Sequence, residues 1–284
     1  MFKKLKITHE TLYEYREPVG FGTHRLILRP REGHDLQVAS MVLDITPGHV
    51  LQWSRDVFGN SVATVEFTED AAALRIVNRV TVNTGALPRL AEAHHTPVPF
   101  PVVYDEEETA VADAYKAAIY PADVVALKAW AQKAAAGADP GEAAAIVSAL
   151  NLAIMRDVRY LRREEKGVQG PIDTLTKSTG SCRDMATLLM EACRTLGIAS
   201  RFSSGYLDCA ASIAGRASTH AWTEVYLPGR GWSGFDPTLG EETSQRHVAV
   251  GVSNHPRAVM PISGRFFGTR ADFLGMTVSV KFEK

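Results

Sequence analysis

A cysteine at the start of a predicted helix is the residue in this sequence best placed for covalent chemistry. The segment GSCRDMATLL covers residues 180–189, and its apolar pattern begins only at Met185, three residues after Cys182. From Met185 onward, apolar residues recur at the three- and four-residue spacing of an amphipathic helix until a glycine supplies a stop. Ser181 suits the N-cap, and Asp184 suits the N3 position of a capping box. This pattern predicts that Cys182 occupies N1, the first helical position.

A thiol at N1 has an environment that favours its reactive form. The unpaired backbone N–H groups and the helix dipole favour negative charge there, and the thiolate is the nucleophilic form of cysteine. The same N–H groups can stabilise an oxyanion that develops on an attacked acyl group. The alternative is a small residue that is merely tolerated at a helix start. Cys193 lies on the apolar face of the same predicted helix and is expected in the core, and Cys209 is interpreted as structural.

A nucleophilic cysteine needs a base, and the base needs an orienting group. Six of the nine histidines precede the predicted helical region, in the β region or the proline-rich connection. His220 lies in STHAWTEVYL, which has the composition of a strand, and PGRG then predicts a turn. The next strand, GWSGFDPT, ends at Asp236, which the following proline keeps extended. A strand histidine or an aspartate before proline means little alone, but together they predict a hairpin that carries both partners.

The register of this hairpin decides whether the two side chains can meet. A two-residue turn at 229–230 would pair Asp236 with Thr223, so that His220 and Asp236 would point to opposite faces. A loop of odd length, or one bulge, would instead put Asp236 opposite Trp222 and diagonal to His220, within side-chain reach. We therefore predict an odd loop or a bulge.

Composition limits the class of protein. The 284 residues are 45% hydrophobic and 22% charged with a net charge of -1, as in globular proteins that bind neither nucleic acid nor an anionic membrane. Three cysteines do not make a disulfide framework, and the odd count fits a reducing compartment. The N-terminus lacks the apolar stretch of a secretion signal, and no run approaches a membrane span. We expect a cytoplasmic protein whose partner is a peptide, a protein or a small amide.

The order of predicted elements indicates an α+β fold with two domains. Residues 1 to about 90 alternate as β-strands do, with recurrent turn signals, which suggests a sandwich-like module. Residues 94–104 contain three prolines and predict an extended connection. Helices are expected from Pro121 to Gly137 and at about 140–158. We assign residues 1–100 to a β-sandwich-like domain and 101–284 to a domain of helices packed on an antiparallel sheet.

The cysteine segment and the hairpin together resemble the bacterial transglutaminase-like family, whose members are described as candidate cysteine proteases. The resemblance rests on GSCRDMATLLMEACRTLGIASRFSSGYL and HAWTEVYLPGRGWSGFDPT, with HRLILRPR and DVFGN similar to that family's N-terminal β domain. It implies a papain-like catalytic domain without a cofactor, and a catalytic triad that maps onto Cys182, His220 and Asp236. In the strand after His247 the chain departs from the family, because 252–254 reads Val-Ser-Asn instead of Arg-Asp-Tyr. If that segment borders the cleft, substrate preference should differ.

These residues predict thiol-dependent acyl transfer on an amide or peptide. We favour hydrolysis, following the family description, over transfer to an amine as in a transglutaminase. A non-catalytic binding or scaffold protein is the alternative from another class, and thiol reactivity distinguishes it. The Cys182 N–H is the expected first oxyanion donor, with Tyr160 and Gln169 as candidates for the second. No metal is expected, because the cysteines and histidines lack ligand spacing and the acidic run 105–108 suits a helix start.

Overall fold

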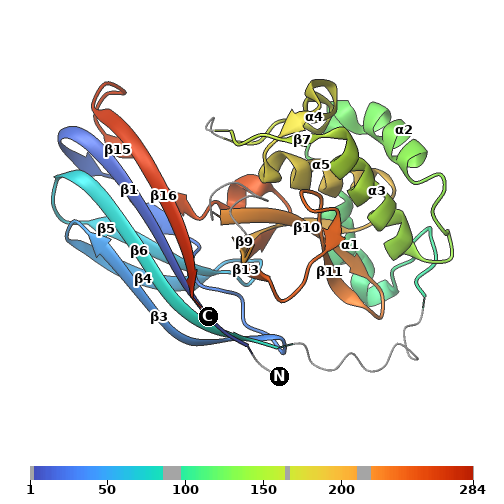
Figure 1. The fold of residues 1–284 in the computed structure, drawn as a ribbon, viewed down its shortest axis with the longest axis horizontal. Coiled ribbons are helices and arrows are strands. Elements are labelled where there is room, and N and C mark those ends of the chain that lie inside the picture. The colour runs from blue at the N-terminus through green and yellow to red at the C-terminus, as the bar shows by residue number, and fades with distance from the viewer. Residues whose placement is uncertain (1–2, 86–96, 164–166, 210–218, 284) are drawn as a thin grey trace.

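The computed structural model describes residues 3–85, 97–163, 167–209 and 219–283 and forms two packed parts (Figure 1). The first part is a β-sandwich. One of its sheets contains β1 (Lys3–Phe21), β3 (Leu36–Thr46), β6 (Ala71–Thr84), β15 (Phe266–Phe267) and β16 (Phe273–Glu283). The other contains β2 (His24–Leu26), β4 (His49–Arg55), β5 (Ser61–Phe67) and β14 (Ile262–Ser263). Alternate residues of both sheets, among them Leu26, Val65 and Ile76, fill the core between them, so the predicted sandwich is observed.

The sandwich is completed by the C-terminal end of the chain. Strand β16 pairs antiparallel with β1 from Lys6↔Glu283 onward, and β14 pairs with β2. The predicted division assigned residues 101–284 to the second domain, whereas this pairing joins 262–283 to the first. One edge of β1 is free to pair with the C-terminal strand. This pairing joins residues far apart in the sequence, so no local pattern predicts it.

The second part consists of helices on an antiparallel sheet. The sheet has the order β12-β11-β10-β9-β13, from β9 (Ser200–Leu207), β10 (Thr219–Leu227), β11 (Gly231–Asp236), β12 (Glu241–Glu242) and β13 (His247–Ser253). Its α-helices are α1 (Glu106–Lys116), α2 (Val124–Ala134), α3 (Ala143–Asp157), α4 (Pro171–Lys177) and α5 (Cys182–Thr195). Two short 3-10 helices, η2 (Pro121–Asp123) and η3 (Pro256–Val259), and a parallel pair of two-residue strands, β7 (Arg159–Tyr160) and β8 (Thr179–Gly180), complete it.

The sheet of the second part lies between the helices and the sandwich (Figure 1). On one side, apolar residues of α3 and α5 pack against Val225 and Phe235. On the other, Tyr206 and Val248 pack against Leu5 and Val80 of the sandwich. The two parts therefore share buried apolar surface, which fixes the sandwich against the sheet.

Helices occur in the segments where the sequence predicts them, with η2 and α2 within 121–137 and α3 within 140–158. The run 105–108 starts α1, where the Asp105 side chain caps the helix by accepting a hydrogen bond from the Glu108 N–H. The predicted connection at 94–104 begins outside the described residues and continues without regular structure from 97 to 104. Within the described part of the chain, no helix combines the length and apolar character needed to cross a bilayer.

Candidate active site

Cys182 is the first residue of α5, as predicted, and a buried carboxylate fixes that end of the helix. Oδ2 of Asp184 accepts hydrogen bonds of 2.8 Å from both the N–H and the hydroxyl of Ser181. Its Oδ1 accepts from the Gln169 N–H at 2.7 Å and from Arg163 Nη1 at 2.8 Å. Asp184 is fully buried, so these four donors replace the water that its charge has lost. The backbone around the cysteine is thereby held in one conformation.

The hairpin has the odd loop that the register argument required. Leu227 pairs with Gly231, so three residues form the loop, and Thr223 pairs with Phe235 rather than Asp236. The loop fits its residues, since Pro228 and a glycine with φ of 76° at position 229 suit successive positions of a type II turn. Extended by one residue, this register places Asp236 across from Trp222 and diagonal to His220. The prediction of an odd loop is confirmed.

His220 and Asp236 form a buried charged pair. Nε2 of His220 lies 2.7 Å from Oδ2 of Asp236, and both side chains are almost completely excluded from water. Burial lowers the pKa of His220, but the hydrogen bonds to Asp236 and Cys182 raise it more, to about 10. Burial raises the pKa of Asp236, yet its hydrogen bonds to the two neighbouring imidazoles leave it well below the usual range. His220 is therefore an imidazolium beside a carboxylate at neutral pH.

A second imidazole fixes the same carboxylate. His247 Nε2 lies 3.1 Å from Oδ2 of Asp236, and its Nδ1 accepts a hydrogen bond from the Ser244 N–H. Because Nδ1 is the acceptor, Nε2 carries the proton and donates to Asp236. The His247 ring also stands edge-on to Trp222, with 5.2 Å between ring centroids. No motif in the sequence marks His247 as a functional residue.

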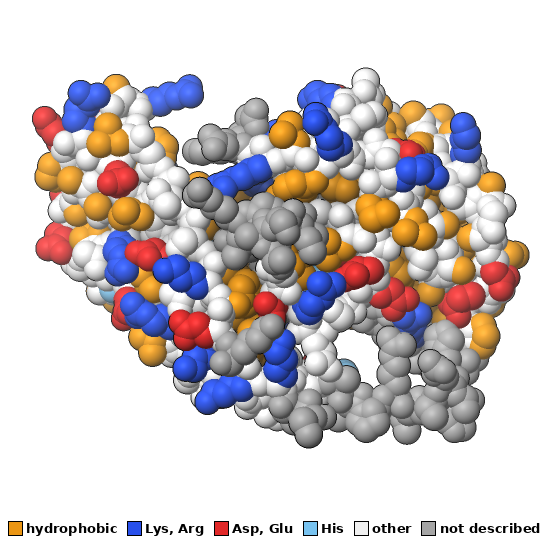
Figure 2. Space-filling view, viewed as in Figure 1, with side chains coloured by type: hydrophobic (Ala, Val, Ile, Leu, Met, Phe, Trp, Pro, Cys, Tyr) orange, Lys and Arg blue, Asp and Glu red, His pale blue; other side chains and the backbone are white. Residues whose placement is uncertain are grey.

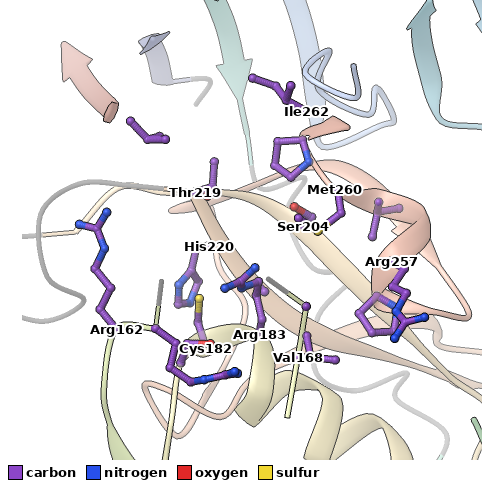
Figure 3. Close-up of a pocket in the computed structure, with 18 of the residues that line it drawn as sticks. Arg162, Val168, Cys182, Arg183, Ser204, Thr219, His220, Arg257, Met260 and Ile262 are labelled. Carbon is purple, nitrogen blue, oxygen red and sulfur yellow. The ribbon is translucent and has the colours of Figure 1, made fainter. Parts of the chain in front are cut away.

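The Cys182 thiol points toward His220 (Figure 3). With Nε2 of the imidazole directed at Asp236, Nδ1 is left to face the sulfur, and a hydrogen bond to this thiol contributes to the raised pKa of His220. The other cysteines differ. Cys193 is fully buried among apolar side chains, and burial raises its pKa to about 12. Cys209 is half-buried, and burial raises its pKa although the charge of His220 opposes this.

Only one of the two candidates for a second oxyanion donor lines the pocket with the thiol. Strand pairing between β7 and β8 puts Tyr160 opposite Gly180, two residues before Cys182, and Tyr160 lines the same pocket. Burial and the nearby Cys182 raise the pKa of Tyr160 to about 12, which keeps its hydroxyl protonated. The amide of Gln169 instead donates to the Thr179 carbonyl at 2.9 Å. The Gln169 side chain therefore fixes the backbone at Thr179, three residues before the cysteine.

Both parts of the molecule line this pocket, which has a volume of about 240 Å³. Tyr13 and Met276 contribute from the sandwich, and residues 256, 257 and 259–262 contribute from the segment after β13. The divergent segment 252–254 does not line the pocket. Val252 is buried and exchanges two backbone hydrogen bonds with the Asn60 side chain, at 2.8 and 2.9 Å. Val252 thus joins the sandwich to the sheet, and the condition for an effect of this segment on substrate preference is not met.

His220, Asp236 and His247 also meet the distance requirement for a metal site, since their ligand atoms lie within 4.8 Å of one another. A cation there would have to replace the protons on both Nε2 atoms. The hydrogen bonds of 2.7 and 3.1 Å already account for the arrangement. We therefore interpret these three side chains as a hydrogen-bonded network.

Known proteins resemble the chain over its whole length. Residues 5–83 match the bacterial transglutaminase-like N-terminal region, and residues 128–237, which contain all three candidate residues, match the transglutaminase-like superfamily. An uncharacterised protein of Mycobacterium leprae is 23% identical over 98% of both chains. The crystal structure of a candidate cysteine protease from Cytophaga hutchinsonii has a TM-score of 0.76 and 20% identity, covering 100% of this chain and 92% of the other. That likeness concerns the fold.

Proposed function

This chain belongs to the transglutaminase-like superfamily, and we propose that it is a cysteine hydrolase of peptide or other amide bonds. The observation that carries the proposal is the continuous hydrogen-bonded series from Cys182 through His220 to Asp236. A carboxylate that is itself held by His247 orients the imidazole. A merely structural histidine would not need to face a thiol at a helix N-terminus.

In the proposed reaction, the Cys182 thiolate attacks the carbonyl carbon of the amide. The new S–C bond forms while the carbonyl electrons move to oxygen, and the Cys182 N–H and the Tyr160 hydroxyl stabilise this oxyanion. The C–N bond then breaks, and His220 gives its proton to the leaving amine. Water next attacks the thioester and loses a proton to His220. The C–S bond breaks, the acid is released, and thiolate and imidazolium are restored.

Asp236 and His247 take part without contacting the substrate. Asp236 keeps the Nε2 proton of His220 in place, so that Nδ1 remains the atom that exchanges a proton with the sulfur and the substrate. His247 positions Asp236. An amine could replace water in the second half of the reaction and would make the protein a transglutaminase. The acceptor is therefore part of the test.

A simple ester serves as the test substrate because it reacts with activated thiols irrespective of specificity. The protein is incubated with p-nitrophenyl acetate, and the acetyl group is located by mass spectrometry. We expect acetylation of Cys182 followed by turnover, and neither in Cys182→Ala. Monodansylcadaverine in the same reaction distinguishes the acceptors, since a transglutaminase would form N-acetylmonodansylcadaverine in place of acetate. Absence of acetylation at Cys182 would contradict the proposal.

A further inference from the structure

Arginine side chains are concentrated around the pocket that contains Cys182. The described residues that line it include four arginines and neither aspartate nor glutamate. These arginines are Arg162, Arg163, Arg183 and Arg257. The chain as a whole has 31 basic and 32 acidic residues, and both signs are interspersed over the face seen in Figure 2. The excess of positive charge is therefore local to the pocket.

One of the four arginines has a structural function. Arg163 donates to Asp184 at 2.8 Å, and its side chain is only 17% exposed. Arg162, Arg183 and Arg257 form no ion pair with a carboxylate in the part of the chain that the structure describes. Residues 164–165, two glutamates that follow Arg163 in sequence, lie outside that part. Among the described residues, three guanidinium groups at the pocket therefore lack a carboxylate partner.

Three separate segments bring these groups to the pocket that contains the thiol. Arg183 follows Cys182 in α5, Arg162 follows the β7 strand that carries Tyr160, and Arg257 lies in η3. Figure 3 shows Arg162 and Arg183 on either side of the Cys182–His220 pair, with Arg257 farther away along the same pocket. The Cys182 thiol already has His220 as its hydrogen-bond partner, so it does not account for three further cations.

Apolar side chains form another part of the pocket lining, beside polar residues such as Ser204 and Thr219. Met260 and Ile262 follow η3, and Met276 comes from β16 of the sandwich. Guanidinium groups bind carboxylates through paired N–H···O hydrogen bonds, and such pairs are stronger where apolar neighbours exclude water. The pocket therefore combines an anion-binding side with an apolar side.

We propose that the preferred acyl donor is an amide that carries a carboxylate close to the carbonyl attacked by Cys182. Arg162, Arg183 and Arg257 bind this carboxylate and so select acidic peptides over neutral ones. The inference rests on the proposed function and adds its substrate class. The carboxylate can belong to an acidic side chain or to the end of a peptide, and both offer the same chemistry to the arginines.

Two alkylating reagents that differ in charge test the anion site without a known substrate. Iodoacetate carries a carboxylate where iodoacetamide carries a neutral amide, and both label thiolates. The ratio of their rates at Cys182 is compared with the ratio for N-acetylcysteine amide in solution, with the labelled residue located by mass spectrometry. We expect the ratio at Cys182 to exceed the solution ratio about tenfold, the effect of one good ion pair.

Variants assign the effect to the arginines. Arg162→Gln, Arg183→Gln and Arg257→Gln should each lower the iodoacetate rate about threefold or more and leave the iodoacetamide rate nearly unchanged. Arg270→Gln, an exposed arginine outside the pocket, is the matched control and should change neither rate. A ratio equal to the solution ratio, with rapid iodoacetamide labelling, would overturn the carboxylate inference alone. Slow labelling by iodoacetamide would instead contradict the proposed function.

A pair of isomers identifies the source of the carboxylate. N-acetylglutamate α-amide has an acidic side chain and a blocked end, whereas N-acetylglutamine has a neutral side chain and a free terminal carboxylate. Each is tested for protection of Cys182 against iodoacetamide, with N-acetylglutamine amide as the neutral control. Protection by the first assigns an acidic side chain, and protection by the second assigns a peptide end. Protection by neither beyond the neutral control would overturn the inference that substrates are acidic.

Discussion

Replacing Asp236 with asparagine tests the charged pair at the centre of the site. Oδ2 of the carboxylate accepts N–H groups from His220 and His247, and Oδ1 accepts the Thr238 N–H at 2.9 Å. An asparagine has one acceptor and one donor for these three hydrogen bonds. In either orientation of the amide, its NH₂ group therefore faces at least one N–H donor at a buried position.

The expected magnitudes follow from this mismatch. Removing one partner of a buried charged pair costs about 3–5 kcal/mol in the free energy of unfolding. The loss of the carboxylate also removes the main interaction that holds the pKa of His220 at about 10. Neutral His220 can then accept from the amide through Nε2, which puts its proton on Nδ1, facing Cys182. Because the imidazolium is then less favoured and the imidazole proton is misplaced, labelling of Cys182 at pH 6 should fall about 10²–10³-fold.

The assay is the rate of iodoacetamide labelling of Cys182 between pH 5 and 9, with circular dichroism to show that Asp236→Asn is folded at the temperature used. Asp173→Asn, an exposed aspartate on α4, is the control and should label as the wild type does. A folded Asp236→Asn protein that labels at the wild-type rate at pH 6 would refute the reasoning, because the carboxylate would then not control the protonation of His220.

Three further changes have expected outcomes. His247→Phe keeps an aromatic ring but removes a hydrogen bond to Asp236. Iodoacetamide labelling of Cys182 should slow about threefold to tenfold, and the free energy of unfolding should fall by about 1–3 kcal/mol. A melting temperature and a labelling rate equal to those of the wild type would argue against a positioning role for His247. The folded-state pKa of His220 is raised from 6.5 to about 10, so its stabilising contribution is complete below about pH 6.5 and is lost as pH rises through 10. Denaturant titrations from pH 6 to 10 should show this decline in the wild type and a flatter profile in His220→Gln, and identical profiles would contradict it. Gly205→Ala should destabilise the protein by about 3 kcal/mol or more, because its Cβ would lie 2.1 Å from a backbone carbonyl oxygen. Gly275→Ala, whose Cβ would have no atom within 4 Å, is the control and should be nearly neutral. Chemical denaturation compares the two variants, and equal stability would show that the sheet can move to accommodate the added methyl group.

The pairing of His220 with Asp236 could be predicted because it depends on local rules. Alternation along two adjacent strands and the parity of one short loop decide which side chains share a face, and both are visible in the sequence. The start of α5 was predictable for a similar reason, since capping residues and apolar spacing act within a few residues of Cys182.

His247 could not be found in the same way. Its strand, β13, is separated from Asp236 by two other strands, and β13 and β9 pair with a shift between Ala249 and Gly251. The contact also needs a glycine at position 205, because the indole of Trp222 occupies the space that a Cβ would take there. The same indole packs against His247. These conditions involve the register of several strands at once. The arginine cluster was missed because its members lie on three segments that only the folded chain brings together.

The most direct test of the central claim is the pH dependence of Cys182 alkylation by iodoacetamide in the wild type and in His220→Ala, with the modified residue located by mass spectrometry. Localisation matters because Cys209 is half-buried nearby and Cys193 is fully buried. We predict rapid labelling of Cys182 well below pH 8.5, the ordinary midpoint for a free thiol, and a shift of the profile to higher pH in His220→Ala. Labelling of Cys182 no faster than a free cysteine, or a profile that His220→Ala leaves unchanged, would contradict the thiolate–imidazolium pair.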